Sequence, residues 1–154
     1  MMMNTRSVRL EDLSKLEYSV RIGKVSAESY RSIMILSFKG EYGFGSRGNS
    51  DARYMSAIGK AVLDAWAPWG LVIDLSELKY EWGDKLDRVF DIGSELARIK
   101  PFPVALTVGP ASEEAVRTLI LGIGAKETIE DIGWVFRSIE EGWTYVANQL
   151  EPKD

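Results

Sequence analysis

Three short apolar runs separated by helical patterns constrain the fold of this chain more than any other feature. They cover residues 32–39, 70–75 and 103–109. Each run is apolar nearly throughout, which is typical of a strand buried on both faces of a sheet. The segments between them, residues 50–66 and 84–100, carry apolar side chains at helical spacing. Strands joined by helices of this length favour right-handed crossovers and a mainly parallel sheet.

Weaker patterns at both ends of the chain add further elements. Residues 17–23 alternate apolar and polar side chains, which predicts a strand. No helix separates this strand from the next one, so we expect the two to pair antiparallel at one side of the sheet. A helix is expected over residues 112–123 and a short strand over residues 133–137. Ser138 and Glu141 fit a capping box that opens a last helix.

The 154 residues fit a single domain that is long enough to bury a core. We expect residues 1–15 to form a flexible tail and residues 16–150 to form the domain. The final EPKD is expected to be loosely held as well. No apolar run approaches the ~20 residues that a membrane-spanning helix needs, and the start lacks a signal-peptide pattern. The expectation is therefore a cytoplasmic protein without membrane insertion.

Composition limits the kinds of function that the chain can have. The net charge of −4 argues against nucleic acid as a main partner, because such proteins usually present a basic face. Cys and His are both absent, which removes disulfides, thiolate chemistry, the commonest proton shuttle and the commonest metal ligand. We therefore predict neither an enzyme nor a cofactor.

Four carboxylates keep a weaker alternative open. Asp74, Glu77, Glu81 and Asp84 follow one strand, and the carboxyl ends of strands are where α/β proteins place ligands. Such oxygen ligands could hold Mg²⁺ or Ca²⁺, or perform acid–base chemistry. The favoured interpretation is a solvated acidic rim.

Residues 69–90 read WGLVIDLSELKYEWGDKLDRVF and carry the most distinctive motif. An apolar strand leads into Asp-Leu-Ser-Glu-Leu, a polar loop and an amphipathic helix. This order resembles the signature of the STAS family of anti-sigma-factor antagonists. Residues 38–41 (FKGE) resemble the Gly-Glu strand end of that family, and residues 136–141 (FRSIEE) resemble its last strand and helix start.

The resemblance spans roughly residues 32–147 and implies both a fold and a class of function. The implied fold is α/β and STAS-like (SpoIIAA-like), a mixed and mainly parallel sheet of about five strands with about four helices. The implied function is that of a non-enzymatic regulatory module that binds a protein partner through the loops after the central strands.

The loop after Asp-Leu-Ser-Glu-Leu departs from the family pattern. Antagonists usually read Asp-Ser-Ser-Gly before a Leu, and matching that Leu to Leu86 places Trp82-Gly83-Asp84-Lys85 in the loop. The phosphoacceptor serine is then replaced by Asp84, so phosphorylation is not expected there. The Asp84 carboxylate could accept backbone N–H bonds at a helix N-terminus. It could instead imitate part of the charge of a phosphoserine. A third interpretation is that the substitution is sequence drift without functional meaning.

The aromatic residues of the same loop are the predicted docking surface. Trp and Tyr are typical of binding hot spots, so Tyr80, Glu81, Trp82 and Asp84 are expected to contact a protein partner. The alternative is that one or both rings fold back into the core. The other tryptophans at apolar positions of their elements, expected to be structural, are Trp66, Trp134 and Trp143.

Residues 43–48 (GFGSRG) match the outline of a dinucleotide fingerprint but not its spacing. Three residues intervene after the strand, and the expected helix cap, Asn49 or Ser50, follows the third glycine. The favoured interpretation is a flexible loop, and a weaker one is an anion site built from backbone N–H groups. The residues that would form it are Gly43, Gly45, Arg47 and Gly48.

Three functional hypotheses remain open after these observations. The first is the STAS-like interaction module, and the second is a carrier of a small lipid-like, nucleotide or anionic ligand. The third is a carboxylate-based, metal-dependent enzyme. Edge strands and surface aromatics could also support a homodimer.

Overall fold

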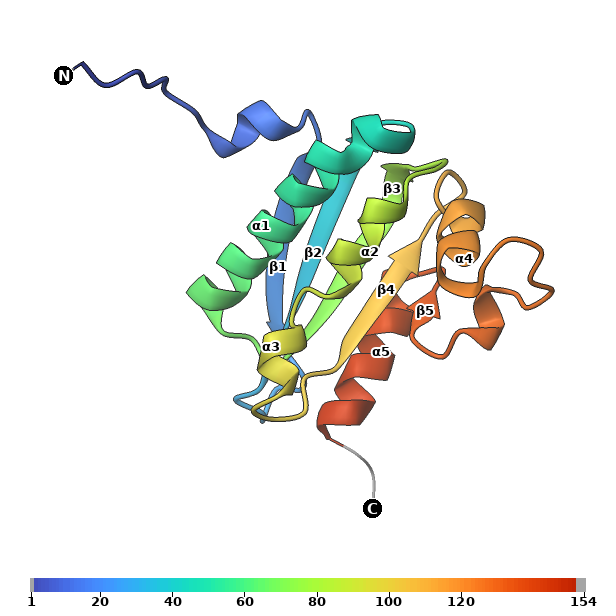
Figure 1. The fold of residues 1–154 in the computed structure, drawn as a ribbon. Helices are drawn as coiled ribbons and strands as arrows, with labels where there is room; N and C mark the ends of the chain where they lie inside the picture. Colours follow the sequence, from blue (N-terminus) through green and yellow to red (C-terminus); the bar gives the residue numbers. More distant parts are fainter. Residues whose placement is uncertain (1, 152–154) are drawn as a thin grey trace.

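The computed structural model describes residues 2–151, and residues 152–154 of the expected C-terminal tail lie outside them. A single five-stranded sheet runs through the molecule in the order β1-β2-β3-β4-β5 (Figure 1). β1 pairs antiparallel with β2, and all other neighbours are parallel. The predicted mixed, mainly parallel sheet is confirmed. The strands are β1 (Glu17–Lys24), β2 (Ser32–Glu41), β3 (Gly70–Lys79), β4 (Val104–Val108) and β5 (Val135–Phe136).

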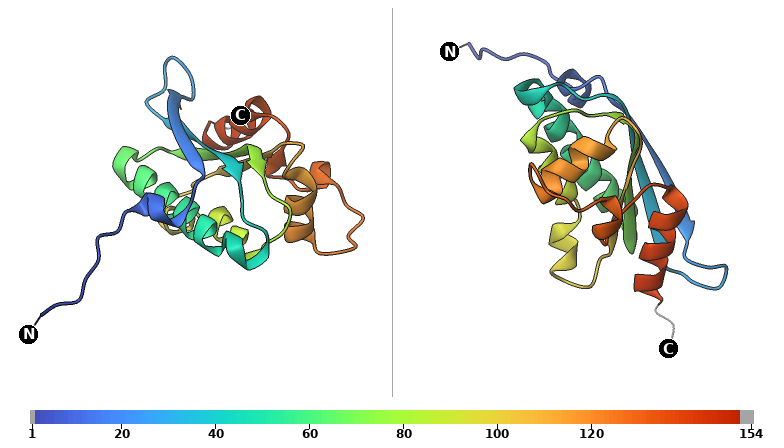
Figure 2. Two further views of the ribbon diagram at one scale, coloured as in Figure 1. Left: turned by 90° about the horizontal axis from the view of Figure 1, so that it is seen from above. Right: turned by 90° about the vertical axis from the view of Figure 1, so that its right-hand side faces the viewer.

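Helices cover both faces of the sheet. Figure 2 shows α5 on one face and the other helices on the opposite face. Strand alternation separates two buried clusters: Met34 and Leu36 belong to the larger cluster, and Ile33 and Ile35 pack with Val146 of α5. Ser138 caps α5 as predicted, since its Oγ accepts a bond from the Glu141 amide at 3.2 Å. The helices are α1 (Asn49–Trp66), α2 (Asp87–Phe90), α3 (Ser94–Ala97), α4 (Glu113–Leu121) and α5 (Ile139–Leu150).

The whole Asp-Leu-Ser-Glu-Leu motif is strand, whereas the sequence predicted a strand that ends at residue 75. β3 continues to Lys79, and its last residues pair with β2 after a register shift between Ser37 and Lys39. This bulge keeps the two strands paired over the extra length. Leu78 is fully buried as a result. The extended strand carries the following loop farther beyond the sheet than the sequence suggested.

The helix predicted over residues 84–100 is broken into three short pieces. A 3₁₀ turn, η3 (Asp84–Leu86), leads into α2, and α3 follows after Gly93. Gly93 has φ of 94°, a left-handed conformation that cannot lie inside an α-helix. A Cβ at this position would also lie 2.8 Å from the Phe102 ring. Apolar side chains do recur at helical spacing in this segment, but Gly93 interrupts the helical backbone.

The N-terminal segment contacts the domain through its last residues. Leu10–Leu13 form a 3₁₀ turn, η1, next to α1. The Ser14 hydroxyl donates to Asp51 Oδ1 at 2.5 Å. Residues 2–9 are exposed and have no regular structure. The division into a tail and a single domain stays a prediction.

Two surface features concern earlier expectations. Trp66, expected in the core, is 65% exposed at the end of α1, so that expectation is wrong. β1 is an edge strand, and its Tyr18 and Ile22 are partly exposed. Self-association through such an edge stays a prediction. No helix within residues 2–151 is both long and apolar enough to cross a membrane.

Candidate functional site

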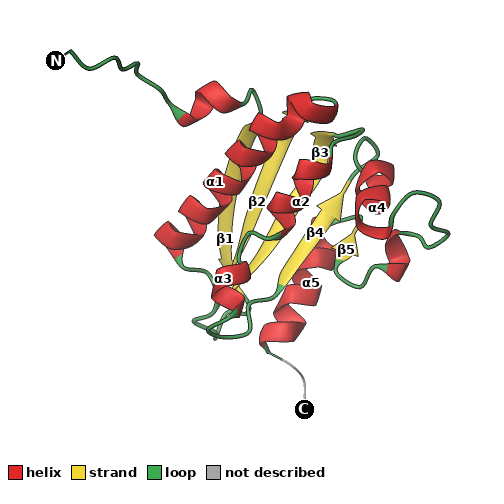
Figure 3. Ribbon diagram, in the orientation of Figure 1, coloured by secondary structure: helices red, strands yellow, loops and turns green. Residues whose placement is uncertain are grey.

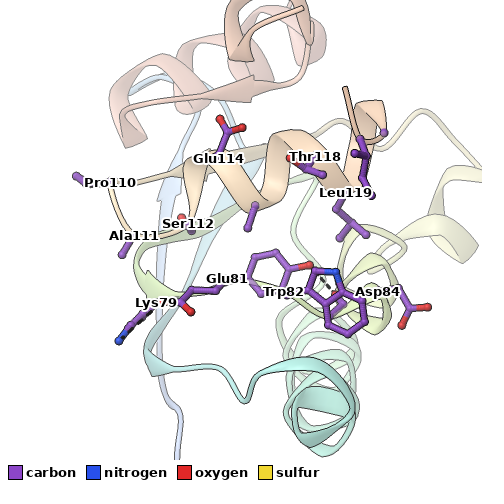
Figure 4. A pocket seen from close by; sticks show the side chains of 15 residues that line it. Lys79, Glu81, Trp82, Asp84, Pro110, Ala111, Ser112, Glu114, Thr118 and Leu119 are labelled. Atoms are coloured by element: carbon purple, nitrogen blue, oxygen red, sulfur yellow. Dashed lines mark hydrogen bonds and ion pairs between the residues drawn. The ribbon is translucent and has the colours of Figure 1, made fainter. Parts of the chain in front are cut away.

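A cleft of about 590 Å³ opens at the carboxyl edge of the parallel strands. One wall is the end of β3 and the loop that follows it, residues 79–84, and the other is the start and outer face of α4. Figure 3 shows both walls at the same end of the sheet, and Figure 4 shows the side chains that line them. We call this feature the β3–α4 cleft. It coincides with the loop that the sequence singled out.

Hydrogen bonds from the sheet fix the α4 wall. Ser112, just before α4, is buried, and its Oγ donates to the Leu75 carbonyl at 3.0 Å. The same Oγ accepts a bond from the Gly109 amide at 3.1 Å. The Tyr80 amide donates to the Ala111 carbonyl at 3.0 Å, which joins the two walls directly. The floor of the cleft is therefore part of the folded sheet.

Tyr80 does not belong to the exposed surface predicted for it. Its side chain is only 3% exposed, and its hydroxyl donates to the Gly83 carbonyl at 2.5 Å. The ring meets Tyr42 edge to face, with centroids 5.1 Å apart. The reason is strand alternation: Leu78 and Tyr80 point inward, and Lys79 and Glu81 point outward. Extending the period-two pattern past Asp74 would have found this from the sequence.

Trp82 is the large exposed residue of the loop. Its side chain is 57% exposed, and its ring lies 5.9 Å from that of Phe44, which is 60% exposed. The Gly45 amide donates to the Trp82 carbonyl at 2.9 Å. The glycine-rich segment and the aromatic loop are therefore in contact. Sequence reasoning missed Phe44, because the residue was considered only as a spacer in the glycine motif.

In the glycine-rich segment, the amides of Gly43, Gly45 and Arg47 all donate to groups of the protein itself. The Gly43 amide donates to Asp51 Oδ2 at 2.9 Å, and the Arg47 amide donates to the Phe44 carbonyl at 3.3 Å. A side chain at Gly48 would overlap the Tyr42 ring. The geometry therefore gives no support to the weaker interpretation of an anion site at Gly43, Gly45, Arg47 and Gly48, which stays a prediction.

The expected cap of α1 also differs. The residue before the helix is Gly48, which forms no side-chain cap bond, and neither Asn49 nor Ser50 takes that role. Asp51, in the first turn of α1, accepts bonds from Ser14 Oγ and the Gly43 amide, which lie outside the helix. Its carboxylate ties the N-terminal segment and the glycine-rich turn to α1.

Asp84 is exposed at the first position of η3, and the residue that precedes this turn is Gly83. Its carboxylate forms no hydrogen bond with any residue in the described range 2–151, so the helix-capping interpretation is wrong. Burial, with smaller contributions from the negative charges of Asp84 and Asp87, raises the pKa of Tyr80 to about 12. Burial likewise raises the pKa of Tyr42, with a smaller contribution from Asp84. Asp84 thus places a negative charge near two buried phenols.

Asp74 lies inside the sheet rather than at the cleft. Its carboxylate accepts bonds from Thr107 Oγ1 at 2.6 Å, Ser37 Oγ at 2.9 Å and the Ser76 amide at 3.0 Å. Burial works to raise the pKa of Asp74, but these hydrogen bonds outweigh burial and hold the pKa below its usual value. The Asp74 carboxylate is a structural link between β2, β3 and β4.

The four carboxylates expected at this edge do not converge. Asp74 is buried, whereas Glu77, Glu81 and Asp84 are exposed. Within residues 2–151, no group of three acidic side chains lies close enough together to hold a metal ion. The carboxylate-based metal hypothesis therefore gains no support from the geometry.

Comparisons with known proteins bear on the fold. No protein-family model and no curated protein sequence matches the chain. Among solved structures, an anti-sigma factor antagonist from Mycobacterium paratuberculosis is similar, with a TM-score of 0.52 and 19% identity. The match covers 84% of this chain and 94% of that one. The STAS-like (SpoIIAA-like) α/β fold predicted from the sequence is therefore confirmed.

Proposed function

We propose that the chain is a non-enzymatic, STAS-like regulatory module of the cytoplasm that binds a protein partner through the β3–α4 cleft. The single observation that carries the proposal is the exposure of Trp82, at 57%, on the loop that follows the central strand. An indole in water costs free energy that a partner surface would recover, and Trp is the commonest type of hot-spot residue. The similar solved structure is an anti-sigma factor antagonist, which supports a role in regulation.

Asp84 supports a module without the usual phosphoswitch. It occupies the start of the helical segment after β3, where the family resemblance expects the phosphoacceptor serine. A kinase that phosphorylates serine needs a hydroxyl group, which aspartate lacks. The carboxylate keeps about one negative charge, less than the −1.5 to −2 of a phosphoserine. We infer a docking surface with a constant charge, whose partner binding does not depend on a kinase.

Trp66 offers a matched control for testing this surface. Trp66 is 65% exposed and lies outside the β3–α4 cleft. The immobilised full chain, Trp82→Ala and Trp66→Ala would each be exposed to lysate of the source cells, with bound proteins measured by quantitative mass spectrometry. We expect a partner retained by the wild type and by Trp66→Ala but reduced at least about tenfold on Trp82→Ala. Equal retention by all three proteins would reject this docking surface.

A second candidate function, a small-ligand carrier, has one specific observation in its favour. The cleft volume of about 590 Å³ lies within the range of about 300–1,000 Å³ that is usual for ligand pockets. Native mass spectrometry of the purified chain tests this idea. A co-purifying mass that disappears when Leu119 is replaced by Arg would support a carrier, and a bare chain mass would argue against it.

A further inference from the structure

The ion pairs around the β3–α4 cleft leave one charge without a partner. Lys79 lies 3.9 Å from Glu41 and 4.0 Å from Glu81. Glu114 is paired with Arg117 at 2.6 Å. These contacts compensate three of the four charged side chains that line the cleft.

Asp84 is the fourth charged side chain, and it has no opposite charge within 4.0 Å in residues 2–151. An incoming cation can therefore pair with Asp84 without first breaking an internal ion pair. An incoming anion would meet the Asp84 charge directly. The cleft is thus biased toward positively charged groups.

The start of α4 does not offset this bias. A helix N-terminus carries a partial positive charge that attracts anions. The first turn of α4 contains Glu113 and Glu114. Their negative charges lie close to the partial positive charge of the helix N-terminus and weaken its attraction for anions. The net charge of the whole chain, −4, acts in the same direction at long range.

Apolar side chains line the cleft next to the exposed Asp84 carboxylate. Trp82 lies on the same wall as Asp84, and Leu119 faces them from α4, as Figure 4 shows. Ile123, which also lines the cleft, is 93% exposed. An aromatic face beside a carboxylate is a favourable site for an ammonium or guanidinium group, since both the ring quadrupole and the charge attract it.

We infer that the partner of the β3–α4 cleft presents an amphipathic peptide segment with a Lys or Arg side chain. The cation pairs with Asp84 against the Trp82 ring, and neighbouring apolar side chains pack on Leu119 and Ile123. The inference rests on the proposed docking function and adds the chemistry of the partner. Asp84 then determines specificity for the partner's charge.

Selection from a library of random 12-residue peptides displayed on phage provides the probe. The full chain is the target, and selected peptides are synthesised and titrated by fluorescence anisotropy. The variants are Trp82→Ala, Asp84→Asn and Asp84→Lys, with Asp64→Lys as the control. Asp64 is exposed on α1, does not line the cleft, and gives the same change in net charge.

The expected result is a set of peptides in which Lys or Arg is flanked by apolar residues. Their affinity should fall about tenfold in Asp84→Lys, less in Asp84→Asn, and remain unchanged in Asp64→Lys. Peptides that depend on Trp82 but bind Asp84→Lys normally would overturn the inference and leave the docking surface intact. A selection without any Trp82-dependent peptide would overturn both.

Discussion

At the residue scale, the buried side chains of Tyr42 and Tyr80 lie in contact but differ in their hydrogen bonding. The Tyr80 hydroxyl donates to the Gly83 carbonyl, whereas the Tyr42 hydroxyl is buried without a hydrogen-bond partner in the described residues. A buried polar group without a partner costs about 1–3 kcal/mol. The two rings touch, so each serves as the control for the other.

Replacing each phenol with phenylalanine should therefore give opposite results. Tyr42→Phe should leave the free energy of unfolding unchanged or raise it by about 1 kcal/mol, because it removes an unsatisfied group. Tyr80→Phe should lower it by about 1 kcal/mol, because it removes the bond that the hydroxyl donates to the Gly83 carbonyl. Urea unfolding followed by circular dichroism measures both values. An equal loss of stability in the two variants would contradict the difference in hydrogen bonding between the two hydroxyls.

Asp74 is the second residue with a definite energetic role, and its contribution should depend on pH. The folded pKa lies below the ordinary value of 3.8, so the stabilisation is present above that pH and is lost as pH falls through the folded pKa. Asp74→Ala should lower the free energy of unfolding by about 3 kcal/mol, because it leaves the buried Thr107 hydroxyl unpaired. Asp74→Asn should cost less.

Urea unfolding at several pH values tests the sign of this effect. The difference in unfolding free energy between wild type and Asp74→Asn should be constant near neutral pH and shrink below about pH 4. A difference that grows as the pH falls would show that the carboxylate is destabilised in the folded state.

At the element scale, local periodicity predicted most of the structure. The three apolar strands, α1 and the Ser138 cap all follow from patterns within one element. The features that the sequence did not predict depend on contacts between distant segments. Alternation past Asp74 indicates which side chains face inward, but the register shift that keeps β3 paired as far as Lys79 depends on β2. The contact of Trp82 with Phe44 needs two loops to meet. No pattern along one segment contains these pairings.

The break between α2 and α3 shows how one residue can interrupt a predicted helix. Gly93 and Gly122 both have positive φ, 94° and 96°, but their ψ angles of −7° and 160° place them in different backbone regions. A Cβ at Gly93 would lie 2.8 Å from the Phe102 ring, whereas a Cβ at Gly122 would have no atom within 4 Å. Steric overlap therefore adds to backbone strain at Gly93, and backbone strain acts alone at Gly122.

Substituting alanine at both glycines measures these two costs. Gly122→Ala should lower the free energy of unfolding by about 1–3 kcal/mol, the cost of a backbone conformation that is open almost only to glycine. Gly93→Ala should cost about 1–2 kcal/mol for its left-handed backbone and about 1–3 kcal/mol more because the Phe102 ring must move. Thermal unfolding followed by circular dichroism gives both values. A loss in Gly93→Ala of no more than about 2 kcal/mol would mean that the ring adapts without cost.

At the scale of the whole molecule, the sheet joins two cores and positions the cleft. The larger cluster lies between the sheet and α1 to α4, and the smaller lies between the sheet and α5. β3 contributes to both, with Ile73 in the larger cluster and Val72 in the smaller. The same strand carries the loop of the candidate site. Loss of either layer exposes one face of β3, so the two layers should not unfold independently.

This coupling predicts a single cooperative transition. Val146→Ala on α5 should lower the free energy of unfolding by about 2 kcal/mol, and Met55→Ala on α1 by about 2–5 kcal/mol. Both side chains are fully buried on opposite faces of the sheet and do not touch, so their costs should add within about 0.5 kcal/mol in the double variant. Circular dichroism and tryptophan fluorescence should report the same midpoint for every variant. If Val146→Ala instead separated the two signals, α5 would unfold as its own unit, and the cleft could persist without it.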